Sequence, residues 1–418
     1  MSPTDEPAHH SSPPSATPAA PTKRRPVGRA VGQQAGPLVG TRVVELAGIG
    51  PAPFAAMLLG DLGADVVRVD RPAAPELSIE PRFDLANRNK RSVVVDLKAP
   101  GGPAAVLGLA ARADIVIEGY RPGVAERLGV GPDHCRAVNP ALVYGRMTGW
   151  GQDGPLATAA GHDIGYIAAA GLLGMIGAPD GPPVVPANLL GDYAGGSLYL
   201  VVGVLAALLK ARVAGAGQVV DAAIVDGAAH LTSVVRGMLA AGTWRDGRGS
   251  NLLDGACPYY GVYETGDGGW MAVGALEPKF YDTFVTLLGL TPAELPDRTA
   301  ERNWPVLRSL FARRFKTAGR DEWAAVFEGT DACVAPVLSL SEAARHPHLA
   351  HRGTYTEAHG ITQPAPAPRF SATPGALRRP PARPGAHNAE VARDWQVDAL
   401  RPPTAPAEPG TGAREGDR

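Results

Sequence analysis

Short runs rich in valine and isoleucine recur through the first 225 residues of this 418-residue chain, separated by helical or glycine-containing stretches. These runs occupy 41–46 (TRVVEL), 65–70 (DVVRVD), 91–96 (RSVVVD), 114–118 (DIVIE), 141–146 (ALVYGR) and 218–225 (QVVDAAIV). β-Branched runs that alternate with helices are typical of a parallel sheet with helices on both faces. The pattern therefore predicts an α/β fold whose large domain is a doubly wound parallel sheet.

Shifts in composition predict how the rest of the chain is organised. The expected segments are a disordered Pro/Ala/Ser-rich extension (1–36), the large α/β domain (37–242), a polar linker (243–258), a smaller α+β domain (259–347), a C-terminal segment that returns to the large domain (348–400) and a disordered tail (401–418). Within the proline-rich C-terminal segment, 365–375 (APAPRFSATPG) is the part expected to be ordered against the body of the protein.

Charge and cysteine usage limit the classes of partner. The 40 basic and 41 acidic residues give a formal net charge of −1, so nothing favours a nucleic acid or a membrane surface. Cys135, Cys257 and Cys333 are far apart and lack metal-ligand spacing, which fits a cytoplasmic protein without a metal site. The N-terminus lacks the apolar centre of a secretory signal. The apolar run 193–209 is expected to be a buried helix rather than a membrane span.

The turn at 48–53 (GIGPAP) imitates a dinucleotide-binding fingerprint. The imitation includes an acidic residue, Asp70, 20 positions beyond Gly50. However, Pro53 stands where the third glycine is needed, and Pro51 removes a backbone N–H that a pyrophosphate would use. The sequence therefore argues against a nicotinamide cofactor.

Cationic side chains follow three of the predicted strands. They are Arg71, Lys98 and Arg121, with Tyr120 beside the last and Arg127 close behind. Ligands of doubly wound sheets bind at the carboxyl ends of the strands. These residues either hold a phosphorylated, base-bearing ligand or are solvated loop cations.

Two titratable side chains precede apolar runs in the stretch 146–196. His162 lies in a Gly-His-Asp sequence and Asp192 in a Gly-Asp sequence, and each is expected at the start of a helix. The positive end of the helix macrodipole favours a neutral imidazole, which is a usable base, and the N–H of Asp163 can donate to an oxyanion. Two such groups facing each other could exchange a proton with a substrate between them. Since aspartate is a preferred N-cap residue, a purely structural role for Asp192 stays open.

Two further residues have both a functional and a structural interpretation. Glu277, just before a proline at the end of a predicted strand, can orient His162 or be an ordinary loop carboxylate. His230, among alanine, leucine and threonine on a predicted helix, is interpreted as a core or interface histidine.

Several motifs, in this order along the chain, resemble those of the family III coenzyme A transferases. They are VVELAGIGPAP, LLGDLGADVVRVDRP, VVVDLK, IEGYRPGVAERLGVGPD, RMTGWGQDGP, AGHDIGYI, GQVVDAAIVDG and DACVAPV. The resemblance extends from about residue 37 to residue 375. Within it, AGHDIGYI and ALEPKFY look like the α-methylacyl-coenzyme A racemases of that family.

The resemblance implies a cofactor-independent racemase that interconverts the 2R and 2S forms of 2-methyl-branched acyl-coenzyme A (acyl-CoA) thioesters through an enolate. It implies that His162 and Asp192 are the proton-transfer groups and that Glu277 partners His162. Coenzyme A, as part of the substrate, is implied to contact Arg71, Val95, Asp96, Leu97, Lys98, Gly119, Tyr120, Arg121, Arg127, Gly161, Asp163, Ile164, Gly165 and Tyr166. The family architecture is an interlocked homodimer, which would bring Glu277 to His162 from the partner chain.

Two other functions remain open. In the transferases, the aspartate that matches Asp192 is the nucleophile that forms an acyl anhydride, and the histidine of Gly-His-Asp is not part of that pattern. The presence of His162 therefore favours the racemase over a transferase that moves CoA between an acyl-CoA and a carboxylic acid. The third possibility is a non-catalytic acyl-CoA-binding protein.

Overall fold

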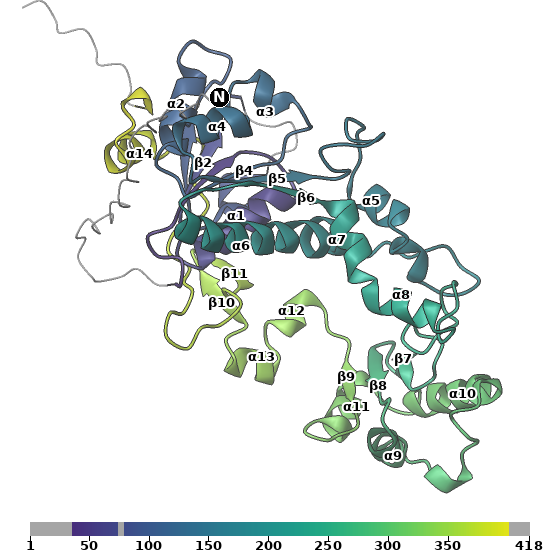
Figure 1. Ribbon diagram of the computed structural model, residues 1–418. Coiled ribbons are helices and arrows are strands. Elements are labelled where there is room, and N and C mark those ends of the chain that lie inside the picture. Colours follow the sequence, from purple (N-terminus) through teal and green to yellow (C-terminus); the bar gives the residue numbers. More distant parts are fainter. Residues whose placement is uncertain (1–35, 74–78, 401–418) are drawn as a thin grey trace, which may run out of the picture. The chain divides into compact units, whose positions relative to one another are not determined.

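Six parallel strands form the central sheet (Figure 1). The computed structural model describes residues 36–73 and 79–400, so all but the last residue of the predicted extension and the whole predicted tail lie outside the described residues. The strands are β1 (Arg42–Leu46), β2 (Asp65–Asp70), β3 (Lys90–Val94), β4 (Ile115–Glu118), β5 (Val143–Thr148) and β6 (Val219–Ala223). They pair in the order β3-β2-β1-β4-β5-β6, which confirms the predicted parallel sheet.

The strand order reverses between β1 and β4. The chain passes from β1 outward to β2 and β3, then returns to place β4 on the other side of β1. Open parallel sheets bind their ligands at the carboxyl ends of the strands beside such a reversal. The segments 47–50 and 119–121, which follow β1 and β4, lie at this position.

Helices cover both faces of the sheet because successive strand residues point to opposite sides. Val43 packs in a core with α1 (Pro51–Asp61) and α6 (Leu198–Ala214), whereas its neighbour Val44 packs in a core with α2 (Gly102–Ala110). Figure 1 shows α1 and α6 on one side and α2 on the other. The other helices of this part are α3 (Val124–Arg127), α4 (Pro132–Val138), α5 (Asp163–Ala169), α7 (Ile224–Leu231) and α8 (Ser233–Ala240).

The C-terminal segment returns to the sheet through α14 (Asn388–Trp395). Trp395 is fully buried in the core that contains Val44, and its indole Nε1 donates to Asp65 Oδ2 at 2.9 Å. The expectation that 365–375 would be the only ordered contact of this segment is wrong, since α14 also packs in the core, whereas 365–375 itself is largely exposed. The prolines around α14 argued against a helix in the sequence, but α14 is amphipathic and buries one face against the sheet.

A second hydrophobic core draws on residues between 257 and 334. It contains the antiparallel strands β7 (Tyr260–Glu264), β8 (Trp270–Gly274) and β9 (Val334–Pro336), with helices α9 (Pro278–Leu287), α10 (Trp304–Phe315) and α11 (Arg320–Phe327). The helices α12 (Leu340–Ala343) and α13 (Pro347–His351) and the hairpin of β10 (Tyr355–Ala358) and β11 (Ile361–Pro364) follow. The predicted boundaries of the smaller domain stay a prediction.

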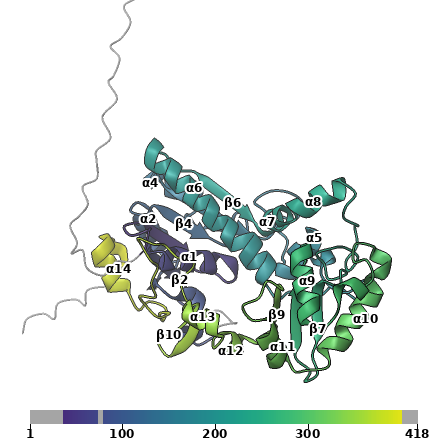
Figure 2. The same ribbon diagram turned by 90° about the horizontal axis from the view of Figure 1, so that it is seen from below.

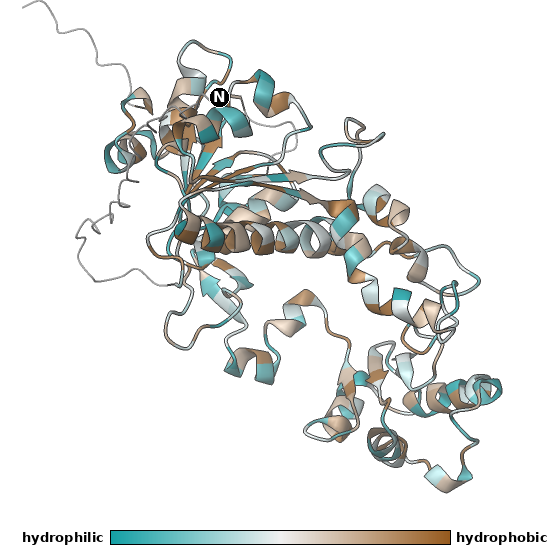
Figure 3. Cartoon of the chain, in the orientation of Figure 1, coloured by the Kyte–Doolittle hydropathy of each residue, from teal (hydrophilic) through white to brown (hydrophobic). Residues whose placement is uncertain are grey.

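One helical stretch, Leu189–Ala214, is long and apolar enough to cross a membrane by length and composition alone. Its C-terminal part, α6, packs against β5 and β6 of the sheet (Figure 2). The predicted burial is correct for one face only. The other face exposes the apolar side chains of Leu198, Val202, Leu209 and Val213. Figure 3 shows hydrophobic, brown segments along α6. A helix that is apolar all round is normally covered all round, but residues 36–73 and 79–400 of one chain leave this face of α6 uncovered.

His230 is exposed, so its interpretation as a core histidine is wrong, and the alternative of an interface histidine stays a prediction. Helix α7 buries Ile224, Gly227 and Ala228, which puts position 230 on the outer face. There Nδ1 of His230 lies 2.7 Å from the hydroxyl of Tyr199.

Candidate functional site

His162 is the N-cap residue of α5, as predicted. Its backbone is extended (φ −134°, ψ 169°), and its carbonyl accepts the N–H of Gly165 at 2.9 Å. The side chain makes no capping hydrogen bond and is exposed. The main chain thus starts the helix and leaves the imidazole available for chemistry.

Asp192 lies inside a helix rather than at its start. It is the fourth residue of the π-helix η4 (Leu189–Ser197), whose N-cap residue is Asn188 and which continues into α6. The predicted helix start at Asp192 is wrong, and so is the alternative that Asp192 only caps a helix. The apolar residues before Asp192 already belong to the helix, and π-helical turns are frequent at functional sites.

The carboxyl group of Asp192 is half-buried, and its surroundings change its acidity. Burial is the largest cause and raises the pKa of Asp192, and the charge of Asp163 raises this pKa as well. Two other neighbours lower the pKa of Asp192: Nδ2 of Asn188, which donates a hydrogen bond of 3.1 Å to Oδ2, and the charge of His162. The net effect is a raised pKa, which suits a group that must exchange protons. The sequence reasoning missed Asn188, although its spacing of four residues from Asp192 is the spacing of neighbours on a helix.

Asp192 also adjoins the start of α1, where the sheet order reverses. Oγ of Ser197 lies 2.8 Å from the carbonyl oxygen of Pro51 and 2.9 Å from that of Asp192. A Cβ atom added at Gly50, whose φ is +75°, would lie 3.5 Å from Oδ2 of Asp192. The glycine-proline turn after β1 therefore lies directly beside the carboxylate of Asp192.

The imitation of a dinucleotide fingerprint fails at Asp70. Its carboxylate accepts hydrogen bonds from Arg68 at 2.9 Å and from the hydroxyl of Ser92 at 2.5 Å. Both oxygens of the carboxylate therefore already accept hydrogen bonds from side chains of the sheet. The sequence argument against a nicotinamide cofactor stays a prediction.

The predicted ligand-binding cations lie at the carboxyl edge of the sheet. Arg71 follows β2, Lys98 comes shortly after β3, and Arg121 follows β4, with Arg127 in α3. All four side chains are exposed, and none forms an ion pair with a carboxylate of residues 36–73 or 79–400. Burial raises the pKa of Tyr120, and the charge of Arg71 lowers it, so the ring and this cation are neighbours. This edge offers unpaired positive charge and an aromatic ring to a phosphorylated ligand.

Three of the predicted coenzyme A contacts have their side chains turned inward. Val95, Asp163 and Tyr166 are 7%, 6% and 8% exposed. The ring of Tyr166 packs edge-on against Trp150 at 4.9 Å between centroids. At these positions contact with a ligand is left to the main chain. The other predicted positions are exposed or half-buried: Asp96, Leu97, Gly119, Gly161, Ile164 and Gly165.

Glu277 is the exposed N-cap residue of α9 and makes no capping hydrogen bond. In the part of the chain that the structure describes, no hydrogen bond or ion pair joins it to His162. Its charge acts instead on Cys333, whose pKa is raised by burial and then by Glu277. A single chain therefore brings His162 and Asp192 together without Glu277.

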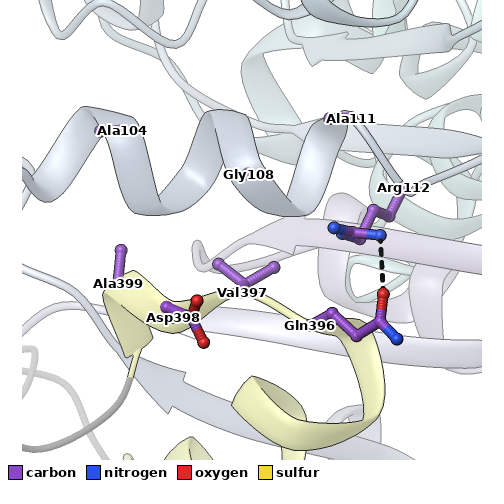
Figure 4. Close-up of a pocket in the computed structure, with 8 residues that line it drawn as sticks. All are labelled: Ala104, Gly108, Ala111, Arg112, Gln396, Val397, Asp398 and Ala399. Carbon is purple, nitrogen blue, oxygen red and sulfur yellow. Dashed lines mark hydrogen bonds between the residues drawn. The ribbon is translucent and has the colours of Figure 1, made fainter.

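A cavity of about 450 Å³ lies away from these residues, between α2 and the C-terminal segment (Figure 4). It is lined by Ala104, Gly108, Ala111, Arg112, Gln396, Val397, Asp398 and Ala399. A hydrogen bond of 3.4 Å joins Arg112 to Gln396 across it. None of the predicted site residues lines this cavity. Across the described residues, no group of three or more His, Cys, Asp or Glu side chains could hold a metal ion.

Comparison with known proteins gives this arrangement a family. The sequence model described as CoA-transferase family III matches residues 38–388. The chain belongs to CoA-transferase family III. Within this family it is 42% identical over 363 residues to the alpha-methylacyl-CoA racemase of Homo sapiens, which covers 86% of this chain and 93% of the racemase.

The chain is also similar, at lower identity, to CoA-transferases. The succinyl-CoA:glutarate CoA-transferase of Homo sapiens is 29% identical over 380 residues, which is 86% of each chain. The crystal structure of a CaiB/BaiF family protein from Brucella suis superposes with a TM-score of 0.75 at 26% identity, over 87% of this chain and 100% of that chain. The mixed α/β fold with its parallel six-stranded sheet is therefore the fold of this family.

Proposed function

We propose that this chain is a racemase that interconverts the 2R and 2S forms of 2-methyl-branched acyl-CoA thioesters without a cofactor. The observation that carries the proposal is the pairing of His162, whose imidazole has no structural task, with Asp192, a carboxyl group of raised pKa in the adjoining helix. The 42% identity to an alpha-methylacyl-CoA racemase supports the same reaction.

Inversion at the α-carbon needs one group that accepts a proton and another that donates one on the opposite face. In one direction the neutral imidazole of His162 takes the α-proton. The electron pair of the broken C–H bond forms the C=C bond of an enolate, and the carbonyl oxygen gains the charge. Protonated Asp192 then gives its proton to the other face of the α-carbon, and the carbonyl re-forms. In the reverse direction the two groups exchange roles, so no proton is gained or lost overall.

The enolate oxygen needs hydrogen-bond donors that are already in place. The first N–H groups of a helix have no acceptor within the helix and lie at its positive end. Asp163 is the first residue of α5, so its N–H is such a donor and directly follows His162. A donor fixed where charge develops lowers the barrier more than water does.

The CoA part of the substrate is proposed to bind along the carboxyl edge of the sheet. The unpaired cations Arg71, Lys98, Arg121 and Arg127 would bind its phosphate groups, and the half-buried ring of Tyr120 would contact the adenine. Substrate recognition then depends on local charge, although the whole chain carries a formal net charge of −1. The charge balance supports the absence of a nucleic-acid or membrane partner, and the three cysteines without disulfide or metal spacing support a cytoplasmic enzyme.

An interlocked homodimer is the proposed functional unit. The described residues of one chain leave the apolar face of α6 exposed, and a second copy would cover it. Among the described residues of its own chain, Glu277 has no hydrogen bond or ion pair with His162, and Glu277 of the partner subunit would reach His162 in the dimer. This arrangement would hold the imidazole in one tautomer.

Deuterium incorporation at the α-carbon tests the proposal. A panel of 2-methylacyl-CoA thioesters is incubated with the enzyme in heavy water, and each enantiomer is followed by mass spectrometry. Both enantiomers are expected to gain deuterium and to racemise, and His162→Ala and Asp192→Ala should each abolish racemisation. If neither enantiomer of any thioester exchanges, the proposal fails.

A CoA transferase is the second candidate, because the family includes transferases and Asp192 could serve either reaction. The carboxylate of Asp192 would attack the thioester carbonyl and expel the thiolate of CoA, leaving an acyl anhydride. Hydroxylamine would then trap an adduct on Asp192, and activity would require a second carboxylic acid. A non-catalytic binder would show neither α-proton exchange nor this adduct, so the two assays separate all three functions.

A further inference from the structure

The side chain of Asp163 makes a contact that none of the predicted roles uses. It is 6% exposed, and its Oδ2 accepts the backbone N–H of Asp192 at 2.7 Å. Its Oδ1 is buried and has no hydrogen-bond partner among the described residues. No cation forms an ion pair with it in this part of the chain. A buried carboxylate with one unpaired oxygen costs folding free energy, so this placement points to a task in the site.

The bonded N–H is available because η4 is a π-helix. Its hydrogen bonds run from each carbonyl to the N–H five residues later, so the N–H groups of its first turn lack an acceptor within the helix. Asp192 is the fourth residue of η4, and Asp163 supplies the missing acceptor from another helix. The short bond therefore holds the main chain at Asp192 in place.

Gly191 lets this carboxylate approach. A Cβ atom added at Gly191 would lie 2.3 Å from Oδ2 of Asp163 and 2.8 Å from its Cγ, which is too close for any other residue. Glycine at position 191 is thus what allows the carboxylate of Asp163 to reach the N–H of Asp192.

We propose that Asp163 is a positioning residue whose carboxylate fixes Asp192 relative to His162. Asp163 directly follows His162 in the chain, so a single side chain links the position of one proton-transfer group to the backbone of the other. Its own N–H remains free to face the enolate oxygen. This inference rests on the proposed racemase function, and it assigns the side chain of Asp163 to Asp192 rather than to coenzyme A.

The test exploits the two faces of the reaction. One enantiomer is deprotonated by His162 and the other by Asp192, and in heavy water each exchange is measured separately from racemisation. In Asp163→Ala, racemisation should fall about 100-fold in both directions, because a displacement of about 1 Å at a reacting group costs that much. Exchange of the enantiomer that meets His162 should fall less than about 5-fold, since the imidazole and the N–H at position 163 remain. The KM for acyl-CoA should stay within about 2-fold.

Conservative and matched variants complete the experiment. Asp163→Asn keeps an oxygen that can accept the N–H of Asp192, and it should restore racemisation to within about 5-fold of the wild type. Gly191→Ala pushes the carboxylate away and should reproduce the one-sided loss even if Asp163→Ala does not fold. The control is Asp114→Ala, which removes a similar bond, from Oδ2 to the N–H of Arg42 at 2.8 Å, and should change neither exchange.

The outcomes are distinct. A one-sided loss of exchange that Asp163→Asn repairs supports the inference. The inference is overturned if exchange falls equally for both enantiomers, or if both Asp163→Ala and Gly191→Ala leave exchange unchanged. Absence of exchange in the wild-type enzyme instead overturns the proposed function, and the two failures are therefore told apart.

Discussion

The hydrogen bond from Asn188 to Asp192 predicts a specific change in the pH dependence of the enzyme. Both directions of the proposed reaction require one proton shared between His162 and Asp192, and the two active forms differ only in which group holds it. Because these forms carry the same total charge, kcat/KM has the same bell-shaped pH dependence in both directions. Ionisation of Asp192 sets the acid side of that curve.

The expected size of the effect comes from the geometry of the bond. Nδ2 of Asn188 donates to Oδ2 of Asp192 at 3.1 Å, and the bond lowers the pKa of Asp192. A hydrogen bond to an ionised group contributes about 1.5–3 kcal/mol when shielded. Since Asn188 is exposed, water competes, and about 1 kcal/mol is expected, or about a five-fold change in proton affinity.

In Asn188→Ala, the lost bond removes stabilisation of the ionised carboxylate, so the pKa of Asp192 rises and the acid side of the kcat/KM curve moves to higher pH. The shift should correspond to about a five-fold change in proton affinity and be equal for the two enantiomers. The alkaline side should stay in place. Racemisation rates measured by chiral chromatography across a pH series check this, with Asn303→Ala, which removes a 2.8 Å bond to the carbonyl of Asp297, as the control. An acid side that is unmoved or shifts to lower pH refutes the reasoning.

Three further changes test the binding edge and the core. Arg121→Ala should raise the KM for acyl-CoA about 10-fold with little change in kcat, and should weaken the salt dependence of KM, both read from initial rates. Trp395→Ala should lower the free energy of unfolding by about 3–5 kcal/mol in urea titrations, while Arg393→Ala on the same helix changes it by less than about 0.5 kcal/mol. Lys90→Met leaves the fully buried Glu45 without the partner that lies 2.6 Å away and should cost about 3–5 kcal/mol. Burial then raises the pKa of Glu45 in the folded state, so the stability of this variant should fall as pH rises.

The sheet was predictable because its strands are buried on both faces. Runs such as 65–70 and 114–118 are continuous in valine and isoleucine, and that pattern has few other structural solutions. The cations at the strand ends were then placed by topology, since all parallel strands present their carboxyl ends at one edge. The N-cap position of His162 followed from local chemistry in the same way.

The π-helix was not predictable from the same kind of reasoning. Its apolar and glycine residues fit an α-helix that begins after Asp192 as well as they fit η4, and tertiary contacts decide between them. The acceptor at Asp163 and the close approach at Gly191 come from a segment 29 residues away, measured from Asp163 to Asp192. The helix α14 was missed for a related reason, because its burial depends on the packing of Val391, Ala392 and Trp395 in a core formed by residues far away in the sequence.

The surroundings of Asp192 separate the two candidate reactions better than Asp192 itself does. Anhydride formation moves no proton at the α-carbon, so a transferase gains nothing from a free imidazole beside its nucleophile. Racemisation needs a form in which Asp192 is protonated, and the free-energy gap between that form and the ionised form narrows by about 1.4 kcal/mol for each unit by which the pKa of Asp192 rises. Burial of Asp192 and the adjacent charge of Asp163 both raise the pKa of the carboxyl group and so narrow this gap. Burying the carboxyl groups of Asp163 and Asp192 side by side therefore makes protonated Asp192, which donates the proton in racemisation, easier to form.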